Sequence, residues 1–168
     1  RRYGIKKGGD FINLKDIIIL GTGPTSTQCP FDCEVWMVNN TYKQWERKPD
    51  KVFIVHKQVL NKDGNPIFNW GEMNRLETDI ISLYDIPELK CRPYPYEKIF
   101  AFSRYMTNSI CYMLAYAILI EKVDKFSLYG IDMVEGGEYY YEKSGVEWWL
   151  GVARGMGIPF YIAPGGAL

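Results

Sequence analysis

Apolar residues in this chain come in short runs separated by polar turns, and these runs predict the strands of a buried sheet. The first run, residues 16–20, contains four apolar residues, mostly β-branched, which is typical of a parallel strand covered on both faces. Further strands are predicted at residues 34–38, 51–55, 126–129 and 158–162, and residues 78–83 fit either a strand or the end of a helix. We therefore expect a mainly parallel sheet of five or six strands.

Helical periodicity dominates the second half of the chain. Residues 107–121 carry apolar side chains at helical spacing, have a polar start that can cap a helix, and contain no charge before Glu121. A second, amphipathic helix is predicted to begin at Ser144 or Gly145 and to end near Arg154. Strands that alternate with helices predict an α/β fold with three layers, in which helices cover both faces of the sheet.

The chain length fits one domain. A chain of 168 residues can bury about two thirds of the surface that it exposes when unfolded. Residues 1–15 mix basic residues and glycines without a clear period, so we expect a flexible lead-in. The single domain would then span residues 16–168.

Composition narrows the classes of partner. The 20 basic residues balance the 20 acidic ones, so no overall field favours nucleic acid or an anionic membrane, although local patches remain open. No apolar stretch reaches the ~20 residues of a membrane span, and a cytoplasmic location, in a bacterium or a phage-infected host cell, is the default expectation. The cysteines lack the spacing of a zinc site or a disulfide scaffold and are interpreted as reduced thiols: Cys29, Cys33, Cys91 and Cys111.

A glycine-containing turn follows the first predicted strand. It consists of Gly21, Thr22, Gly23, Pro24 and Thr25. The two glycines allow positive φ and a close approach of the backbone to a ligand, and the proline and hydroxyl residues can open a short helix, which together suit a phosphate. The alternative is that the turn is an ordinary strand exit. The third glycine of a dinucleotide fingerprint is replaced by Ser26, which disfavours an NAD enzyme.

Polar residues follow three other predicted strands. Asn39 and Asn40 end the second strand, His56 follows the third, and Asp132 comes after the strand at residues 126–129. Open α/β sheets bind ligands at the carboxyl ends of their strands. We therefore expect these side chains and the glycine turn to lie along one edge of the sheet.

Four segments, taken together, resemble known families. They are residues 17–25 with the strand and G-x-G-P turn, 35–39 with the strand ending in asparagine, 107–113 with the threonine and serine that begin a helix, and 128–132 with the strand ending in G-I-D. In this order they resemble the bacterial family 42 sialyltransferases and, more distantly, the Rossmann-like domains of archaeal pterin diphosphokinases. The pattern is most similar to small Rossmann-like proteins of phage genomes.

The sialyltransferase resemblance implies a Rossmann-like fold and a cytidine-nucleotide (CMP) sugar as ligand. Carried over by position, the residues that would contact this donor are Thr22, Gly23, Asn39, Ser109 and Tyr140. The family uses a histidine near the carboxyl side of the sheet as general base, and this chain has no histidine after His56. In the family, a lid segment lies between the G-I-D strand and the final helix, and in this chain that segment is reduced to about a dozen residues. Both departures weaken the inference of sialyl transfer.

One histidine and four carboxylates are candidates for proton transfer. His56 has a suitable side chain, although a lone histidine is often structural. The carboxylates of Asp132, Glu138, Glu142 and Glu147 are the other candidates, and the aromatic rings of the tyrosine-rich loop predicted at residues 138–142 can raise a carboxyl pKa. Glutamates in such a loop can equally form a solvated face. The carboxylates would suit Mg²⁺, but no metal-ligand spacing requires a metal.

The sequence thus predicts a transferase that binds a nucleotide or nucleotide sugar, with chemistry near residues 132–142. One alternative is a non-catalytic module of phage origin that sequesters a nucleotide, and another is an interaction subunit that retains only the scaffold. The nucleotide base, the acceptor and the oligomeric state remain open.

Overall fold

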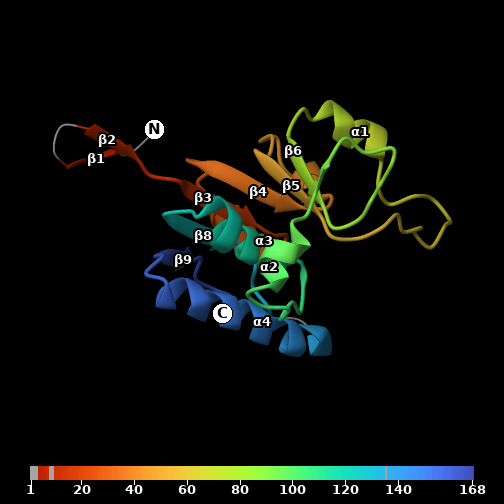
Figure 1. Cartoon of the computed structure of the whole chain (residues 1–168). Coiled ribbons are helices and arrows are strands. Elements are labelled where there is room, and N and C mark those ends of the chain that lie inside the picture. The colour runs from red at the N-terminus through yellow and green to blue at the C-terminus, as the bar shows by residue number, and fades with distance from the viewer. Residues whose placement is uncertain (1–3, 8–9, 135) are drawn as a thin grey trace.

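The computed structural model describes the backbone of residues 4–7, 10–134 and 136–168, and the side chains of residues 14–134 and 139–168. In this part of the chain, seven strands form one parallel sheet in the order β7-β6-β5-β4-β3-β8-β9 (Figure 1). The strands are β3 (Asp16–Leu20), β4 (Glu34–Val38), β5 (Lys51–Ile54), β6 (Asp79–Ser82), β7 (Arg92–Pro93), β8 (Lys125–Tyr129) and β9 (Phe160–Ile162). The α/β fold is confirmed with one strand more than the expected maximum. The additional strand is β7, at the edge of the sheet. It has only two residues, one of them a proline, and no apolar run in the sequence predicts it.

The helical elements include several that the sequence does not predict. The helical elements are η1 (Pro24–Gln28), η2 (Thr41–Gln44), α1 (Trp70–Arg75), α2 (Tyr96–Phe100), α3 (Ser109–Tyr116), η3 (Ala117–Glu121) and α4 (Gly136–Gly155). The helix predicted over residues 107–121 is confirmed as α3 and its π-helical continuation η3. Helix α4 begins earlier than expected, so the tyrosine-rich segment predicted as a loop is helical. None of the described helices is long and apolar enough to cross a membrane.

Both faces of the sheet are buried, which explains the continuous apolar runs. In β3, Ile17 and Ile19 pack in the cluster that contains α3 and the buried face of α4. Ile18 and Leu20 point to the other face, where they join a cluster with η2 and α1. Each of these four side chains is at most 1% exposed. Burying one such side chain contributes about 1.5–3 kcal/mol, so the four side chains of β3 together contribute strongly to the core.

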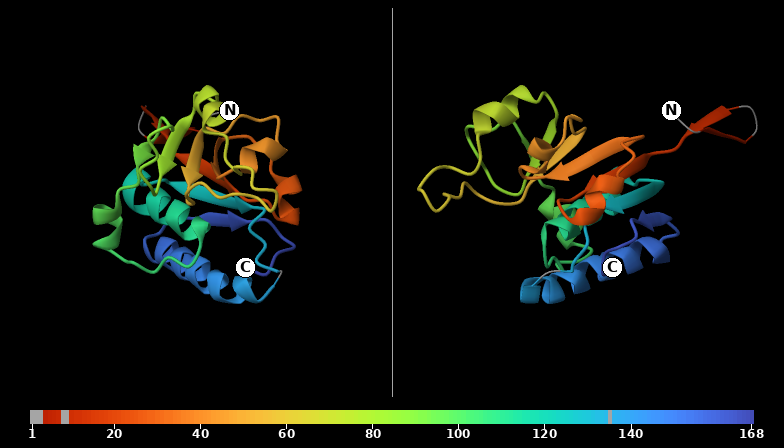
Figure 2. Two further views of the ribbon diagram at one scale, coloured as in Figure 1. Left: turned by 90° about the vertical axis from the view of Figure 1, so that its right-hand side faces the viewer. Right: turned by 180° about the vertical axis from the view of Figure 1, so that it is seen from behind.

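The lead-in contains regular structure. Strands β1 (Gly4–Lys7) and β2 (Asp10–Asn13) pair antiparallel, and Figures 1 and 2 show them projecting from the rest of the chain. Lys15 follows β2, and its backbone N–H donates to the carboxylate of Asp124 over 2.7 Å. This contact fixes the point at which the lead-in joins the domain.

The order of the strands creates a crevice between β3 and β8. From β3 the chain adds strands on one side as far as β7, then returns through α3 to place β8 against the other side of β3. Adjacent parallel strands whose connections leave in opposite directions form a topological switch point, which opens at their carboxyl ends. The exits of β3 and β8 are therefore the place where this fold can hold a ligand.

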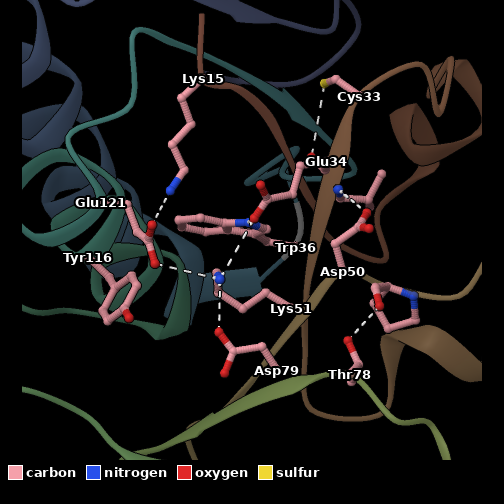
Figure 3. Close-up of polar contacts among 12 residues, drawn as sticks. Lys15, Cys33, Glu34, Trp36, Asp50, Lys51, Thr78, Asp79, Tyr116 and Glu121 are labelled. Carbon is pink, nitrogen blue, oxygen red and sulfur yellow. Dashed lines mark hydrogen bonds and ion pairs between the residues drawn. The ribbon is translucent and has the colours of Figure 1, made fainter. Parts of the chain in front are cut away.

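A buried lysine organises the opposite end of the sheet. The Nζ atom of Lys51 lies 2.9 Å from Asp79, 3.6 Å from Glu121 and 3.7 Å from Glu34 (Figure 3). It also lies 5.3 Å from the centre of the Trp36 ring. The Lys51 side chain is only 9% exposed, so these partners replace the water that a free ammonium group would bind.

The charges of this cluster depend on one another. Burial alone would lower the pKa of Lys51, but the hydrogen bond to Asp79 and the surrounding carboxylates outweigh burial and raise it. Burial alone would raise the pKa of Asp79, but hydrogen bonds from Arg92 and Lys51 lower it. The pKa of Glu121 is lowered in the same way, against burial, by Lys15 and Lys51.

We predict that Lys51→Met destabilises the protein by about 2 kcal/mol at pH 7, because it leaves partly buried carboxylates without their cation. Groups with a lowered folded-state pKa stabilise the fold above their ordinary pKa and lose this contribution as the pH falls. The effect of Lys51→Met should therefore be smaller at pH 3.5, which lies below the ordinary pKa values of aspartate and glutamate. Urea unfolding at both pH values measures it.

The control for this variant is Lys125→Met. Lys125 pairs with Asp16 over 3.1 Å, but its side chain is 49% exposed. Removing such a pair should change stability by less than about 0.5 kcal/mol. Equal effects of the two substitutions, or a Lys51→Met effect that does not vary with pH, would contradict the role given to the cluster.

Candidate functional site

The exits of β3 and β8 are in direct backbone contact. The N–H of Gly21 donates to the carbonyl of Tyr129 over 2.8 Å, and the N–H of Gly23 donates to Gly130 over 2.9 Å. A Cβ atom on Gly21 would lie 2.2 Å from the Gly130 carbonyl oxygen. Because no side chain fits there, Gly21 is required by the neighbouring strand.

The conformation of the turn differs from the one expected. Gly23 has φ −67°, and at this contact the positive φ, 67°, belongs to Gly130. A Cβ atom on Gly23 would lie 2.4 Å from a carboxylate oxygen of Asp132. The two glycines of the turn therefore make room for the β8 exit, and the left-handed conformation occurs on the opposite side of the contact.

Thr25 and Asp132 join the two exits through side chains. The carboxylate of Asp132 accepts hydrogen bonds from the backbone N–H of Thr25, over 2.9 Å, and from its hydroxyl group. The same hydroxyl oxygen accepts from the N–H of Gly130 over 2.8 Å. Thr25 and Asp132 are 4% and 5% exposed. Since both carboxylate oxygens are engaged, Asp132 stabilises the two turns against each other.

A cavity of about 370 Å³ opens beside this contact. The residues that line it come from β3 and β4 exits, the start of α3, the β8 exit and the first turns of α4: Gly21, Thr22, Gly23, Pro24, Val38, Asn108, Ser109, Ile110, Gly130, Ile131, Asp132, Met133, Val134, Tyr139 and Glu142. The cavity thus lies at the switch point of the sheet. Its volume is within the range of small-molecule sites.

Helix α3 directs its amino terminus into this cavity. The side chain of Asn108 accepts a hydrogen bond from the N–H of Cys111 over 3.1 Å and so caps the helix. Ser109 and Ile110, the first residues of the helix, line the cavity. Their N–H groups are at the helix end that carries partial positive charge, which favours an anion such as phosphate.

Most of the glycine turn lies where the sequence predicted. Residues 21–24 line the cavity together with Ser109 and Asp132. Thr25 lies behind the lining, where it bonds to Asp132. The turn, the start of α3 and the β8 exit, predicted separately, are therefore brought together by the fold.

The two asparagines lie outside the lining and hold neighbouring loops. The Oδ1 atom of Asn39 accepts from the N–H of Val55 over 3.1 Å, which ties the exit of β4 to that of β5. The Nδ2 group of Asn40 donates to the carbonyl of Ile67 over 3.0 Å. The second strand instead contributes Val38 to the cavity.

The remaining predicted residues have different positions. His56 is exposed and is not among the lining residues. Tyr140 is 80% exposed, because in a helix it points about 100° away from Tyr139, which lines the cavity. The side chain of Glu138 lies outside the described residues. Among the described side chains, no group of three His, Cys, Asp or Glu residues could hold a metal ion.

Two lining residues come from α4, in the tyrosine-rich segment that the sequence placed near the site but predicted as a loop. Tyr139 and Glu142 are three positions apart, so both face the cavity once the segment is helical. A helical start at residue 136 was hidden by Gly136 and Gly137, which resemble a bend. The spacing of these two residues was the signal that could have identified them.

No protein-family model and no curated protein matches the sequence. A solved structure of the sialyltransferase CstII from Campylobacter jejuni, in complex with the substrate analogue cytidine-5'-monophosphate, matches with a TM-score of 0.58. The match covers 92% of this chain and 82% of that chain at 17% sequence identity. The expected sialyltransferase-like fold is therefore confirmed. Similarity to pterin diphosphokinase domains and to phage proteins stays a prediction.

We predict that Thr25→Val destabilises the protein by about 2–3 kcal/mol, because it leaves the Gly130 N–H and one carboxylate oxygen buried without a partner. Thr25→Ser keeps the hydroxyl group and should recover most of this loss. Urea unfolding followed by circular dichroism compares the two variants. If valine and serine are equally tolerated, the contact between the strand exits does not depend on this hydroxyl group.

Proposed function

We propose that this protein binds a nucleotide sugar with a cytidine monophosphate moiety in the cavity at the β3 and β8 exits, and that it transfers the sugar as a glycosyltransferase. The observation that carries the proposal is the position of the cavity at the switch point of the sheet. The fold is shared with a sialyltransferase whose structure holds cytidine-5'-monophosphate, which supports the nucleotide class.

The lining offers groups suited to each part of such a ligand. The amino terminus of α3 and the hydroxyl of Ser109 would bind the phosphate. Thr22 and the backbone of Gly23 would contact it from the opposite wall. Apolar and aromatic side chains, among them Val38 and Tyr139, would pack against the base or sugar. Departure of the phosphate would be favoured by N–H and hydroxyl groups already in position.

Asn39 and Asn40 would act indirectly in this scheme. Their side chains hold the loops after β4 and β5, so they would set the shape of the cavity rim. Thr25 would hold the turn against the β8 exit, while Pro24 lines the cavity. Tyr140, at the exposed side of α4, remains a candidate for contacts with bound ligand only if α4 moves.

One observation favours a second function. His56, the one histidine of the sequence, is exposed and outside the lining. A nucleotide-binding module without transferase activity would keep the cavity and need no base. Turnover distinguishes the two functions: release of CMP from a CMP-sugar supports the transferase, and retention of CMP without turnover supports the binding module.

We predict that CMP raises the melting temperature in a concentration-dependent manner, because a ligand that binds the native state stabilises it. Ser109→Ala should weaken CMP binding about tenfold through loss of a hydrogen bond to a charged phosphate. Isothermal titration calorimetry with CMP, UMP, AMP and inorganic phosphate measures affinity and base preference.

The matched control is Ser103→Ala, which removes a hydroxyl outside the lining that accepts from the N–H of Tyr105 over 3.1 Å. It should leave CMP affinity unchanged. The proposal fails if no nucleotide binds, or if both serine variants have the same affinity for CMP.

A further inference from the structure

Helix α4 makes its close approach to the start of α3 at the wall of the cavity. A Cβ atom on Gly145 would lie 2.1 Å from the hydroxyl oxygen of Thr107. That hydroxyl group donates to the backbone carbonyl of Glu142 over 2.7 Å. Glu142 is three residues before Gly145 and so lies on the same side of the helix. These contacts fix the backbone of Glu142 beside the start of α3.

The carboxylate of Glu142 is available for chemistry. The residue Glu142 lines the cavity and is partly buried. Across residues 14–134 and 139–168, no hydrogen bond or ion pair engages its carboxylate oxygens. Asp132, the other acid of the lining, has both oxygens bonded to Thr25. Within the described lining, Glu142 is thus the acid that can accept a proton without breaking a structural contact.

Neighbouring acids on α4 are placed differently. Glu147 is exposed and lies 3.4 Å from the ammonium group of Lys143. Five residues along a helix correspond to a rotation of about 140°, so Glu147 points away from the side that carries Glu142. The side chain of Glu147 therefore offers a carboxylate on the same helix that does not line the cavity.

We propose that Glu142 is the general base of the cavity, an inference that rests on the proposed nucleotide-sugar transfer. The oxygen of an acceptor hydroxyl or water forms a bond to the anomeric carbon of the donor sugar. The bond between that carbon and the phosphate oxygen breaks, and CMP leaves with the electron pair. The proton of the attacking O–H group passes to the carboxylate of Glu142. The structure thereby selects Glu142 from the candidates that the sequence offered for this role.

The test is release of CMP from a CMP-sugar by the full chain and by Glu142→Gln. A general base typically increases the rate of the chemical step about 10²–10⁴-fold. In Glu142→Gln, kcat should therefore fall at least about 100-fold, while the dissociation constant of CMP should change less than about threefold. Glu147→Gln should keep the kcat of the natural chain. The acidic limb of the pH profile of kcat should be lost in Glu142→Gln and kept in Glu147→Gln.

A rescue experiment separates base chemistry from a structural role. Formate, a small carboxylate, should restore part of the activity of Glu142→Ala and should not stimulate the natural chain. Full activity of Glu142→Gln, or absence of rescue together with an unchanged pH profile, would overturn the inference. Binding of CMP by the natural chain without any turnover would also overturn it and would leave the nucleotide site standing. Absence of CMP binding would instead reject the proposed function itself.

Discussion

The contact between the exits of β3 and β8 is the constraint on which the site depends. Two backbone hydrogen bonds, at Gly21 and Gly23, hold the strand exits together. A side chain on Gly21 would collide with the Gly130 carbonyl, and Thr25 and Asp132 complete the connection. The glycine turn is thus shaped by its neighbour in the sheet, and the cavity forms beside the two connected strand exits.

This arrangement gives the glycines a different meaning from the one their sequence suggests. In a turn that cradles phosphate, the missing side chains leave room for the ligand. Here the space at Gly21 and Gly23 is filled by the β8 exit. The groups that face the cavity are instead on the outer surface of the turn, at the start of α3 and in the first turns of α4. A binding site can therefore share the position of a phosphate loop while its glycines serve backbone packing.

The apolar pattern of the sequence was sufficient to identify secondary structure in segments that are buried along their whole length. The apolar run at residues 16–20 and the periodic segment at residues 107–121 each identify their element, because both are covered by the core. Side-chain contacts between distant segments could not be predicted from local pattern, because the hydrogen bond between Thr25 and Asp132 joins residues 107 positions apart. The Lys51 cluster was missed for the same reason.

The site itself was only half predictable. The turn and Ser109 follow from strand and helix ends, whose positions are set by apolar periodicity. The segment of Tyr139 and Glu142 was expected near the site, but Gly136 and Gly137 resembled a bend, so its helical structure and the side chains that face the cavity could not be predicted. Neighbouring residues of a helix point about 100° apart, so an alignment that is wrong by one residue selects a different side chain. Tyr139 lines the cavity, whereas Tyr140 is 80% exposed.

The most direct measurement of the central claim is a map of backbone amide chemical shifts in the ¹H–¹⁵N spectrum during titration with CMP. If the switch-point cavity is the nucleotide site, the largest changes will fall on Thr22, Gly23, Ser109, Ile110 and Met133, which line it. Amides near the Lys51 cluster, at the opposite end of the sheet, should remain unchanged. Changes concentrated away from the cavity, or no change at saturating CMP, would contradict the account.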